Sequence, residues 1–393
     1  MKTECTISTC FPGYVRIESD KPRVPDDFVR IFNVLNDRSS DIGGAAALGR
    51  IGIVDAYPDG NSPKTLLKRS YLSFIPMDRQ QLLSSIRDVL GRAGFSVSDP
   101  YMIHLPGFDL VARREDTLLI LKALTNIDGL SEEVGKELRT LAYLLKATPL
   151  LIGEKNGVSS LQDDVVYFRF GIQAVTLTTL TNHVFNKASV DAYAAPGGLY
   201  VNLDKEKIRR LRQEKNISLG TFARSVHVSR RTVRMYEDGM SARIDIASRI
   251  EELFEEQVST PIDLLRPLMV EAERLPSYQE DHMKAFQQEV FSLLQDVGYK
   301  IIPMDRCPFE ALSKEKEKIL LTCVQEYNKK LVEKAHFVSS IAKVTKRHAV
   351  VFTDKDVEKK NVEGTPVIVK RELKKIHDPQ DVLELILERL TSD

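Results

Sequence analysis

The chain has 393 residues, enough for two or three domains, and its 56 lysines and arginines balance 56 aspartates and glutamates. Net charge therefore favours no partner, and a nucleic-acid interface would need basic residues that are unevenly placed. The four cysteines have no zinc-site spacing, and neither a membrane-spanning apolar run nor a signal peptide stands out, so we expect a cytoplasmic protein.

Residues 1–76 are rich in proline, glycine, serine and aspartate and show little sustained periodicity. We expect this segment to be a poorly structured N-terminal extension. A strongly amphipathic helical pattern begins at Met77. Compact structure is therefore predicted to start there.

Helical and strand patterns alternate from residue 77 to residue 187. The predicted helices cover 79–92 and 131–146. The predicted strands are 108–114, 117–124, 148–153 and 171–176. This alternation is typical of an α/β domain.

The C-terminal part, residues 283–393, repeats this plan. Phe108 and Leu118 of "PGFDLVARREDTLLILKAL" are ten residues apart, as are Phe309 and Ile319 of "CPFEALSKEKEKILLTCV". "ATPLLIGEK" is likewise matched by "RHAVVFTDK". We interpret the two parts as copies of one duplicated α/β domain, although unrelated α/β domains would share some of these generic patterns.

A central all-α domain is predicted at 204–260, between linkers at 188–203 and 261–282. Its expected helices cover 205–215, a stretch that begins after Ser218, 230–237 and 242–254. Three residues are suited to cap the first three helices: Asp204, Ser218 and Ser229. The break between the second and third helices is only three residues long, which is typical of a helix-turn-helix.

Basic residues concentrate in this central domain. From Lys205 to Tyr236 there are ten lysines and arginines and two acids, a local net charge of +8. A short helix that presents Arg230, Arg231 and Arg234 outward suits the major groove, because guanidinium groups match the acceptors of guanine. The alternative is a four-helix unit with a solvated basic face.

The stretch 208–254 resembles the lambda-repressor-like, Cro-type helix-turn-helix family through the motif "SLGTFARSVHVSRRTVRMYEDG". The resemblance implies DNA contacts by the following residues: Ser229, Arg230, Arg231 and Arg234 to bases or backbone, and Ser218 and Thr221 to phosphates. Leu219 replaces a glutamine that is common in the family. His227 replaces a usual glycine, so it is expected to adopt positive φ.

The chain from about Met77 to Leu390 also resembles an archaeal family of helix-turn-helix transcriptional regulators. "FDLVARRED", "LTNIDGLSEE", "PLLIGEK" and "AAPGGLYVN" carry this resemblance.

The α/β copies are similar to restriction-endonuclease-like PD-(D/E)XK domains, in which two carboxylates hold Mg²⁺ and a lysine assists the attacking water. Asp109 and Lys122 fit two of these positions, but Ile120 stands where the second carboxylate belongs. In the second copy the three positions hold Glu310, Leu321 and Cys323. We therefore expect a degenerate nuclease-like fold without catalytic residues, metal or cofactor, and we interpret Asp109 and Lys122 as surface residues at strand ends.

The leading hypothesis is a transcriptional regulator that binds specific double-stranded DNA sequences and is not an enzyme. A homodimer is expected, because one short helix covers only a few base pairs. No motif indicates a small-molecule effector. Two alternatives remain: a Mg²⁺-dependent nuclease guided by the helix-turn-helix, and a protein-interaction scaffold that has lost DNA binding.

Overall fold

The computed structural model describes residues 6–11, 14–18, 78–100, 107–269, 283–357 and 359–390. The chain forms two units, 1–77 and 78–393. In the first unit, β1 (Thr6–Phe11) and β2 (Tyr14–Glu18) pair as an antiparallel hairpin. The remainder of segment 1–76, for which we expected little structure, lies outside the described residues.

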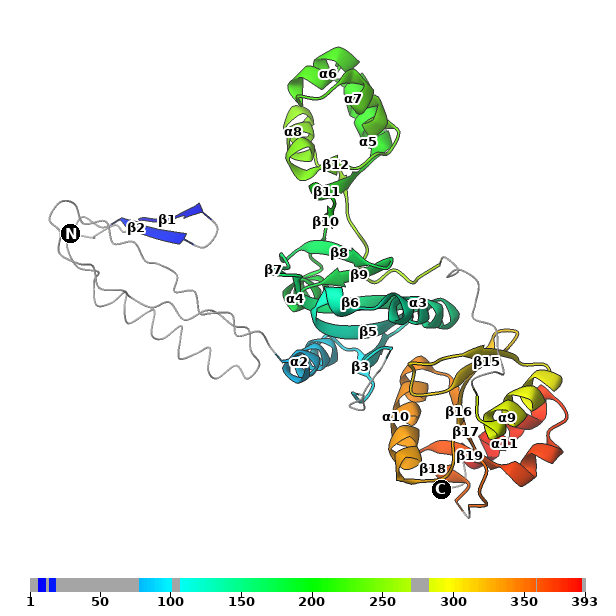
Figure 1. Ribbon diagram of the computed structural model, residues 1–393. Helices are drawn as coiled ribbons and strands as arrows, with labels where there is room; N and C mark the ends of the chain where they lie inside the picture. Colours follow the sequence, from blue (N-terminus) through cyan, green and yellow to red (C-terminus); the bar gives the residue numbers. More distant parts are fainter. Residues whose placement is uncertain are drawn as a thin grey trace. The chain divides into compact units, whose positions relative to one another are not determined.

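The first α/β copy has three helices around a mixed sheet (Figure 1). The helices are α2 (Arg79–Arg92), α3 (Glu132–Leu145) and α4 (Leu177–Asn186), with a short 3₁₀ helix η1 (Ile127–Gly129) before α3. The strands are β3 (Ser96–Val97), β4 (Leu110–Arg114), β5 (Thr117–Asn126), β6 (Thr148–Asn156), β7 (Ser159–Ser160), β8 (Val165–Arg169) and β9 (Ile172–Val175). Strand order is β8-β9-β6-β5-β4-β3, and β5, β6 and β9 run parallel.

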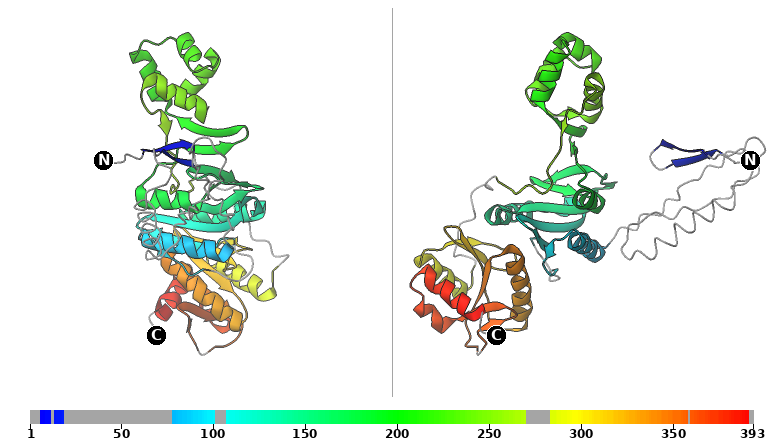
Figure 2. Two further views of the ribbon diagram at one scale, coloured as in Figure 1. Left: turned by 90° about the vertical axis from the view of Figure 1, so that its left-hand side faces the viewer. Right: turned by 180° about the vertical axis from the view of Figure 1, so that it is seen from behind.

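The second α/β copy has the same plan. Its helices are α9 (Ala285–Asp296), α10 (Lys329–Thr345), the 3₁₀ helix η3 (Lys370–Lys375) and α11 (Pro379–Leu390). Its strands are β14 (Lys300–Pro303), β15 (Ala311–Glu315), β16 (Lys318–Val324), β17 (His348–Thr353), β18 (Asn361–Val362) and β19 (Thr365–Val369). Helices α9 and α11 lie on one face of the sheet and α10 on the other (Figure 2).

The two copies match in pairing and in local backbone. Strands β3, β4 and β5 are antiparallel neighbours, as are β14, β15 and β16, and the parallel set β5-β6-β9 corresponds to β16-β17-β19. Residues with positive φ recur at equivalent places: Gly94 and Gly298, Glu115 and Lys316, Lys146 and Lys346. The expected duplication is therefore confirmed.

The segment 188–203 is not the linker we expected. It contains β10 (Ala192–Ala195) and β11 (Gly198–Leu203), which form a hairpin. Strand β10 pairs with β8, and β11 pairs with β12 (Ala242–Arg243) and β13 (Ser259–Thr260), so hydrogen bonds run from the first copy into the central domain. Pro196 and Gly197 form the hairpin turn, with Gly197 at φ 96°.

The other expected linker, 261–282, also begins with ordered structure. Ile262 forms a β-bridge with Val190, and the Leu268 N–H donates to the Ala147 carbonyl. Residues 270–282 lie outside the described part. None of the helices that the structure describes combines the length and apolarity that crossing a bilayer requires.

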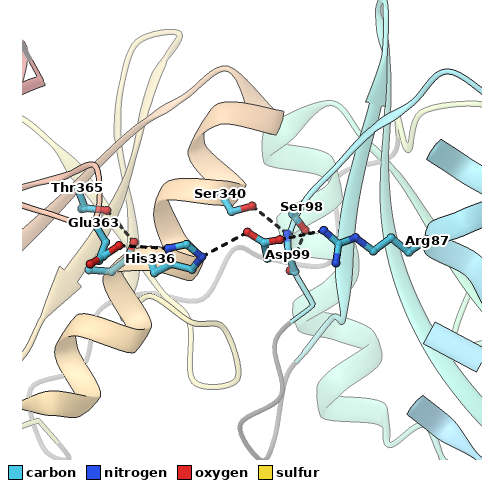
Figure 3. Close-up of polar contacts among 8 residues, drawn as sticks. Arg87, Ser98, Asp99, His336, Ser340, Glu363 and Thr365 are labelled. Atoms are coloured by element: carbon cyan, nitrogen blue, oxygen red, sulfur yellow. Dashed lines mark hydrogen bonds and ion pairs between the residues drawn. The ribbon is translucent and has the colours of Figure 1, made fainter. Parts of the chain in front are cut away.

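The two α/β copies share one hydrophobic core, in which α10 lies against β4. Arg113 donates to the Val344 and Thr345 carbonyls at the end of α10. A row of polar side chains also crosses between the copies (Figure 3): Asp99 lies 3.0 Å from Arg87 and 3.5 Å from His336, whose other ring nitrogen lies 3.5 Å from Glu363.

In the contact between the two copies, a helix of each copy accepts a backbone N–H from the other copy, but the accepting residues are not at equivalent positions. Glu137 of α3 accepts the N–H of Arg306, which follows β14, and Ser340 of α10 accepts the N–H of Asp99, which follows β3. Thr140 is equivalent to Ser340, and Pro303 is equivalent to Asp99. Pro303 has no N–H to donate, and the buried Thr140 hydroxyl has no hydrogen-bond partner among the described residues.

Candidate nucleic-acid interface

Four helices form the central domain (Figure 1): α5 (Lys205–Glu214), α6 (Leu219–Ser225), α7 (Arg230–Glu237) and α8 (Ile244–Phe254). The side chains of Asp204, Ser218 and Ser229 accept N–H groups at the starts of α5, α6 and α7, as predicted. The fourth helix begins later than expected, at Ile244, because the two preceding residues pair with β11 as β12.

A small apolar core sets the angles between these helices. Phe222 of α6 and Phe254 of α8 pack edge to face, with ring centroids 5.2 Å apart. Val233 and Tyr236 of α7 are buried in the same core. The outward face of α7 is therefore the opposite side of the helix.

The turn between α6 and α7 has the expected geometry. His227 adopts φ 56°, so the chain accepts a non-glycine residue in the left-handed region here. Asn216 ends α5 in the same region, at φ 50°. Val228 packs against the core of the central domain and holds the corner between the helices.

Glu237 holds α5 against α7. Its carboxylate, 7% exposed, accepts 2.5 and 3.3 Å hydrogen bonds from the Arg212 guanidinium, while Arg209 donates to its carbonyl oxygen. These contacts fix the end of α7 to α5. Both arginines are occupied by the fold.

Ion pairs divide the ten basic residues between Lys205 and Tyr236 into two groups. Five pair with carboxylates: Lys207–Glu256, Arg209–Asp238, Arg210–Glu214, Arg212–Glu237 and Lys215–Glu255. Four of these acids follow Tyr236, outside the stretch whose charge we counted. No carboxylate of the described residues pairs with the other five, which are Lys205, Arg224, Arg230, Arg231 and Arg234. Unneutralised positive charge therefore concentrates on α6 and α7.

Arg230, Arg231 and Arg234 are all exposed. With about 100° per residue and the buried Val233 and Tyr236 on the inner side, Arg231 lies near the centre of the outer face of α7. Arg230 lies at its edge, toward α6. A methyl group on Gly220 of α6 would be 2.9 Å from an Arg230 guanidinium nitrogen, so the two residues are in close contact.

The start of α6 lies beside this guanidinium. Ser218 and Thr221 are exposed, and their hydroxyl oxygens are 2.9 Å apart. Sequence reasoning missed Gly220, although a glycine inside a helical pattern is the signal that could have drawn attention to it. Together, Ser218, Thr221 and Arg230 form one hydrogen-bonding surface next to the arginines of α7.

Comparisons with known proteins agree with this geometry. A family model for helix-turn-helix domains matches residues 208–259, and one for PD-(D/E)XK superfamily domains matches residues 79–190. A protein of Methanosarcina barkeri named "Putative HTH-type transcriptional regulatory protein" is 37% identical over 323 residues, covering 80% of this chain and 98% of its own. A protein of the same name from Natronomonas pharaonis is 36% identical over 315 residues, covering 80% and 99%. This chain belongs to the family of HTH-type transcriptional regulatory proteins. No solved structure matches it.

The nuclease-like position of this HTH-type regulator differs from our interpretation. Asp109 and Lys122 are not surface residues: Asp109 is 0% and Lys122 7% exposed. One Asp109 oxygen lies 2.5 Å from Arg79 and 3.6 Å from Lys122, and the other accepts the Ala123 N–H at 2.7 Å. The sequence analysis missed the burial of Asp109 because its second cationic partner, Arg79, comes from α2, thirty positions earlier in the chain.

These residues do not fit a magnesium ion. The position of the second carboxylate is the fully buried Ile120, and two cations already face Asp109. Burial lowers the pKa of the Lys122 ammonium, and the neighbouring Asp109 carboxylate opposes that shift. Among the described residues there is no group of three or more His, Cys, Asp or Glu side chains placed to share a metal.

The second copy of the regulator has kept a similar arrangement with other residues. Glu310 accepts the Val324 N–H at 2.8 Å and pairs with Lys334 of α10. Cys323, at the place of Lys122, is buried, and burial raises the pKa of its thiol to about 12. In both copies the acid joins two structural elements through a backbone N–H and a cation.

Proposed function

We propose that this chain reads specific sequences of double-stranded DNA with α7 and regulates transcription through that binding. The observation that carries the proposal is the pair Arg231 and Arg234, which are exposed on a capped helix and lack carboxylate partners among the described residues. A guanidinium without an internal partner is available for the O6 and N7 acceptors of guanine.

The remaining residues have supporting roles in this proposal. Arg230, turned toward Gly220, lies with Ser218 and Thr221 on the side of α6, where phosphate contacts would set the register on the duplex. Ser229 caps α7 and is exposed at the end of the helix that would enter the groove. Thus Arg231 and Arg234 would specify sequence, and the other four residues would position the helix.

In this proposal residues 77–187 and 283–393 are non-catalytic α/β domains on either side of a DNA-binding domain at 204–260. The chain acts as a homodimer, because two-fold pairing presents two copies of α7 to half-sites about 34 Å apart. No effector ligand enters the proposal.

Selection of bound fragments from a random duplex pool tests this function. We expect enrichment of a guanine-containing site, and an affinity for that site that falls with salt at a slope of about 0.9 per phosphate neutralised. Failure to enrich any site, or to shift any duplex at low salt, would favour the interaction-scaffold alternative instead.

The PD-(D/E)XK match makes a guided nuclease the competing function. We propose that the chain is not an enzyme, since Ile120 and the Arg79–Asp109–Lys122 cluster leave one carboxylate, already paired, at the position that would bind metal. The selected duplex should stay intact in the presence of Mg²⁺. Cleavage that is lost in Asp109→Asn would establish the nuclease.

Gly220→Ala separates DNA binding from stability. Alanine is better in a helix than glycine by about 1 kcal/mol, so the free energy of unfolding should not fall. The new methyl group would displace the Arg230 guanidinium, whose nitrogen is 2.9 Å from its position. We expect weaker binding of every duplex by a similar factor, measured by fluorescence anisotropy beside thermal unfolding. Unchanged affinity would remove Arg230 from the interface.

A further inference from the structure

One large apolar side chain is exposed among the arginines of α7. Met235 is 41% exposed, whereas the nearby apolar residues of the same helix, Val233 and Tyr236, are buried. At about 100° per residue it lies about 40° around the helix from Arg231, four positions earlier. Met235 therefore belongs to the same outward face as Arg231 and Arg234.

The position of Met235 does not serve the core of the domain. The core holds Phe222, Val233 and Tyr236 on the other side of α7, and Met235 is not among the residues that pack against it. A flexible thioether side chain at this place can fill an irregular apolar surface on a partner. In the major groove, the apolar feature of a base pair is the C5-methyl group of a pyrimidine.

We propose that Met235 reads the C5-methyl group of a pyrimidine that neighbours the guanine contacted by Arg231 or Arg234. This inference rests on the proposed DNA-binding function and adds to it a specificity for one apolar group. The arginines would then select guanine by donating to its O6 and N7 acceptors, and Met235 would select the neighbouring base pair through van der Waals contact with the pyrimidine methyl group.

A protein contact is the competing explanation for the exposure of Met235. Ile244, at the start of α8, is 43% exposed and belongs to the same domain. Ile244 serves as a matched control, because its exposure is close to that of Met235 and it lies on α8, outside the face of α7 that is proposed to contact bases.

The experiment replaces thymidine by deoxyuridine, one position at a time, in the selected duplex. Wild-type protein should lose affinity about fourfold at one thymine per half-site, the effect expected when one buried methyl-sized group is removed. Met235→Ala should bind the thymine and uracil duplexes equally at that position, and Ile244→Ala should behave as wild type. A cytosine at that position, plain or 5-methylated, distinguishes recognition of the methyl group from recognition of thymine as a base.

Each result decides a different point. If wild type binds its duplex but no uracil substitution matters, or if Met235→Ala keeps the uracil penalty, the methyl reading is wrong while the DNA-binding function stands. If Met235→Ala changes the oligomeric state in light scattering and leaves discrimination intact, Met235 is a protein contact. If wild type binds no duplex, the proposed function itself fails.

Discussion

Replacing Arg231 and Arg234 together with alanine should remove site-specific DNA binding without unfolding the protein. Each guanidinium that pairs with guanine contributes about 1–3 kcal/mol of discrimination, so the double variant should lose about 2–6 kcal/mol of binding free energy on the selected site. Both side chains are exposed, and neither pairs with a carboxylate of the described residues, so the fold loses little. Fluorescence anisotropy on the selected duplex and on a scrambled one measures both effects.

The matched control is Arg210→Ala with Lys215→Ala. It also removes two positive charges from the central domain, but these lie in α5 and directly after it, where Glu214 and Glu255 pair with them. Its affinity should stay within about 1 kcal/mol of wild type, the range of exposed ion pairs. Equal losses in both variants would mean that the domain attracts DNA only through its overall charge. Unchanged affinity and salt slope in the Arg231 and Arg234 variant would show that α7 does not enter the groove.

Asp109→Ala should be the most damaging single substitution in the first α/β copy. It leaves the Lys122 ammonium buried without its nearest carboxylate and the Ala123 N–H without its acceptor. Removing one partner of a buried ion pair typically costs about 3–5 kcal/mol of unfolding free energy. Urea-induced unfolding measures the loss.

The pH dependence of that loss follows from Lys122. Its folded-state pKa is already lowered by burial, and without Asp109 it should fall further. The unfolded chain then binds more protons, so the stability of the variant should rise as pH increases toward 10.5, the ordinary lysine value. Lys122→Met in the Asp109→Ala background should recover part of the lost stability, because it removes the buried ammonium but not the unpaired Ala123 N–H, and should abolish this pH dependence. A mild effect of Asp109→Ala at neutral pH would show that the buried contacts of Asp109 contribute little to stability.

Local chemistry was enough to predict the helix-turn-helix. Asp204, Ser218 and Ser229 cap helices because a side-chain oxygen can reach a free N–H within the same turn, and this depends on residues three positions apart. The positive φ of His227 followed from family resemblance to a glycine position. Features decided within a few residues were therefore within reach of the sequence.

Features that depend on contacts between residues far apart in the chain could not be predicted from the sequence. The charge count between Lys205 and Tyr236 missed Glu237, Asp238, Glu255 and Glu256, which neutralise much of α5 only once the chain has folded. The hairpin β10–β11 was taken for a linker because its strands are short and are stabilised by pairing with β8, β12 and β13. The assignment of Asp109 to the surface failed for the same reason, since its arginine partner belongs to another element.

The mutual packing of the two α/β copies has a consequence for symmetry. Each chain contains a pair of α/β copies in which β4 and α10 cover one another, and its described residues contain a single helix-turn-helix. The duplication of the α/β domain thus does not supply a second helix-turn-helix. Under the proposed function, recognition of a palindrome would therefore require α7 of a second chain.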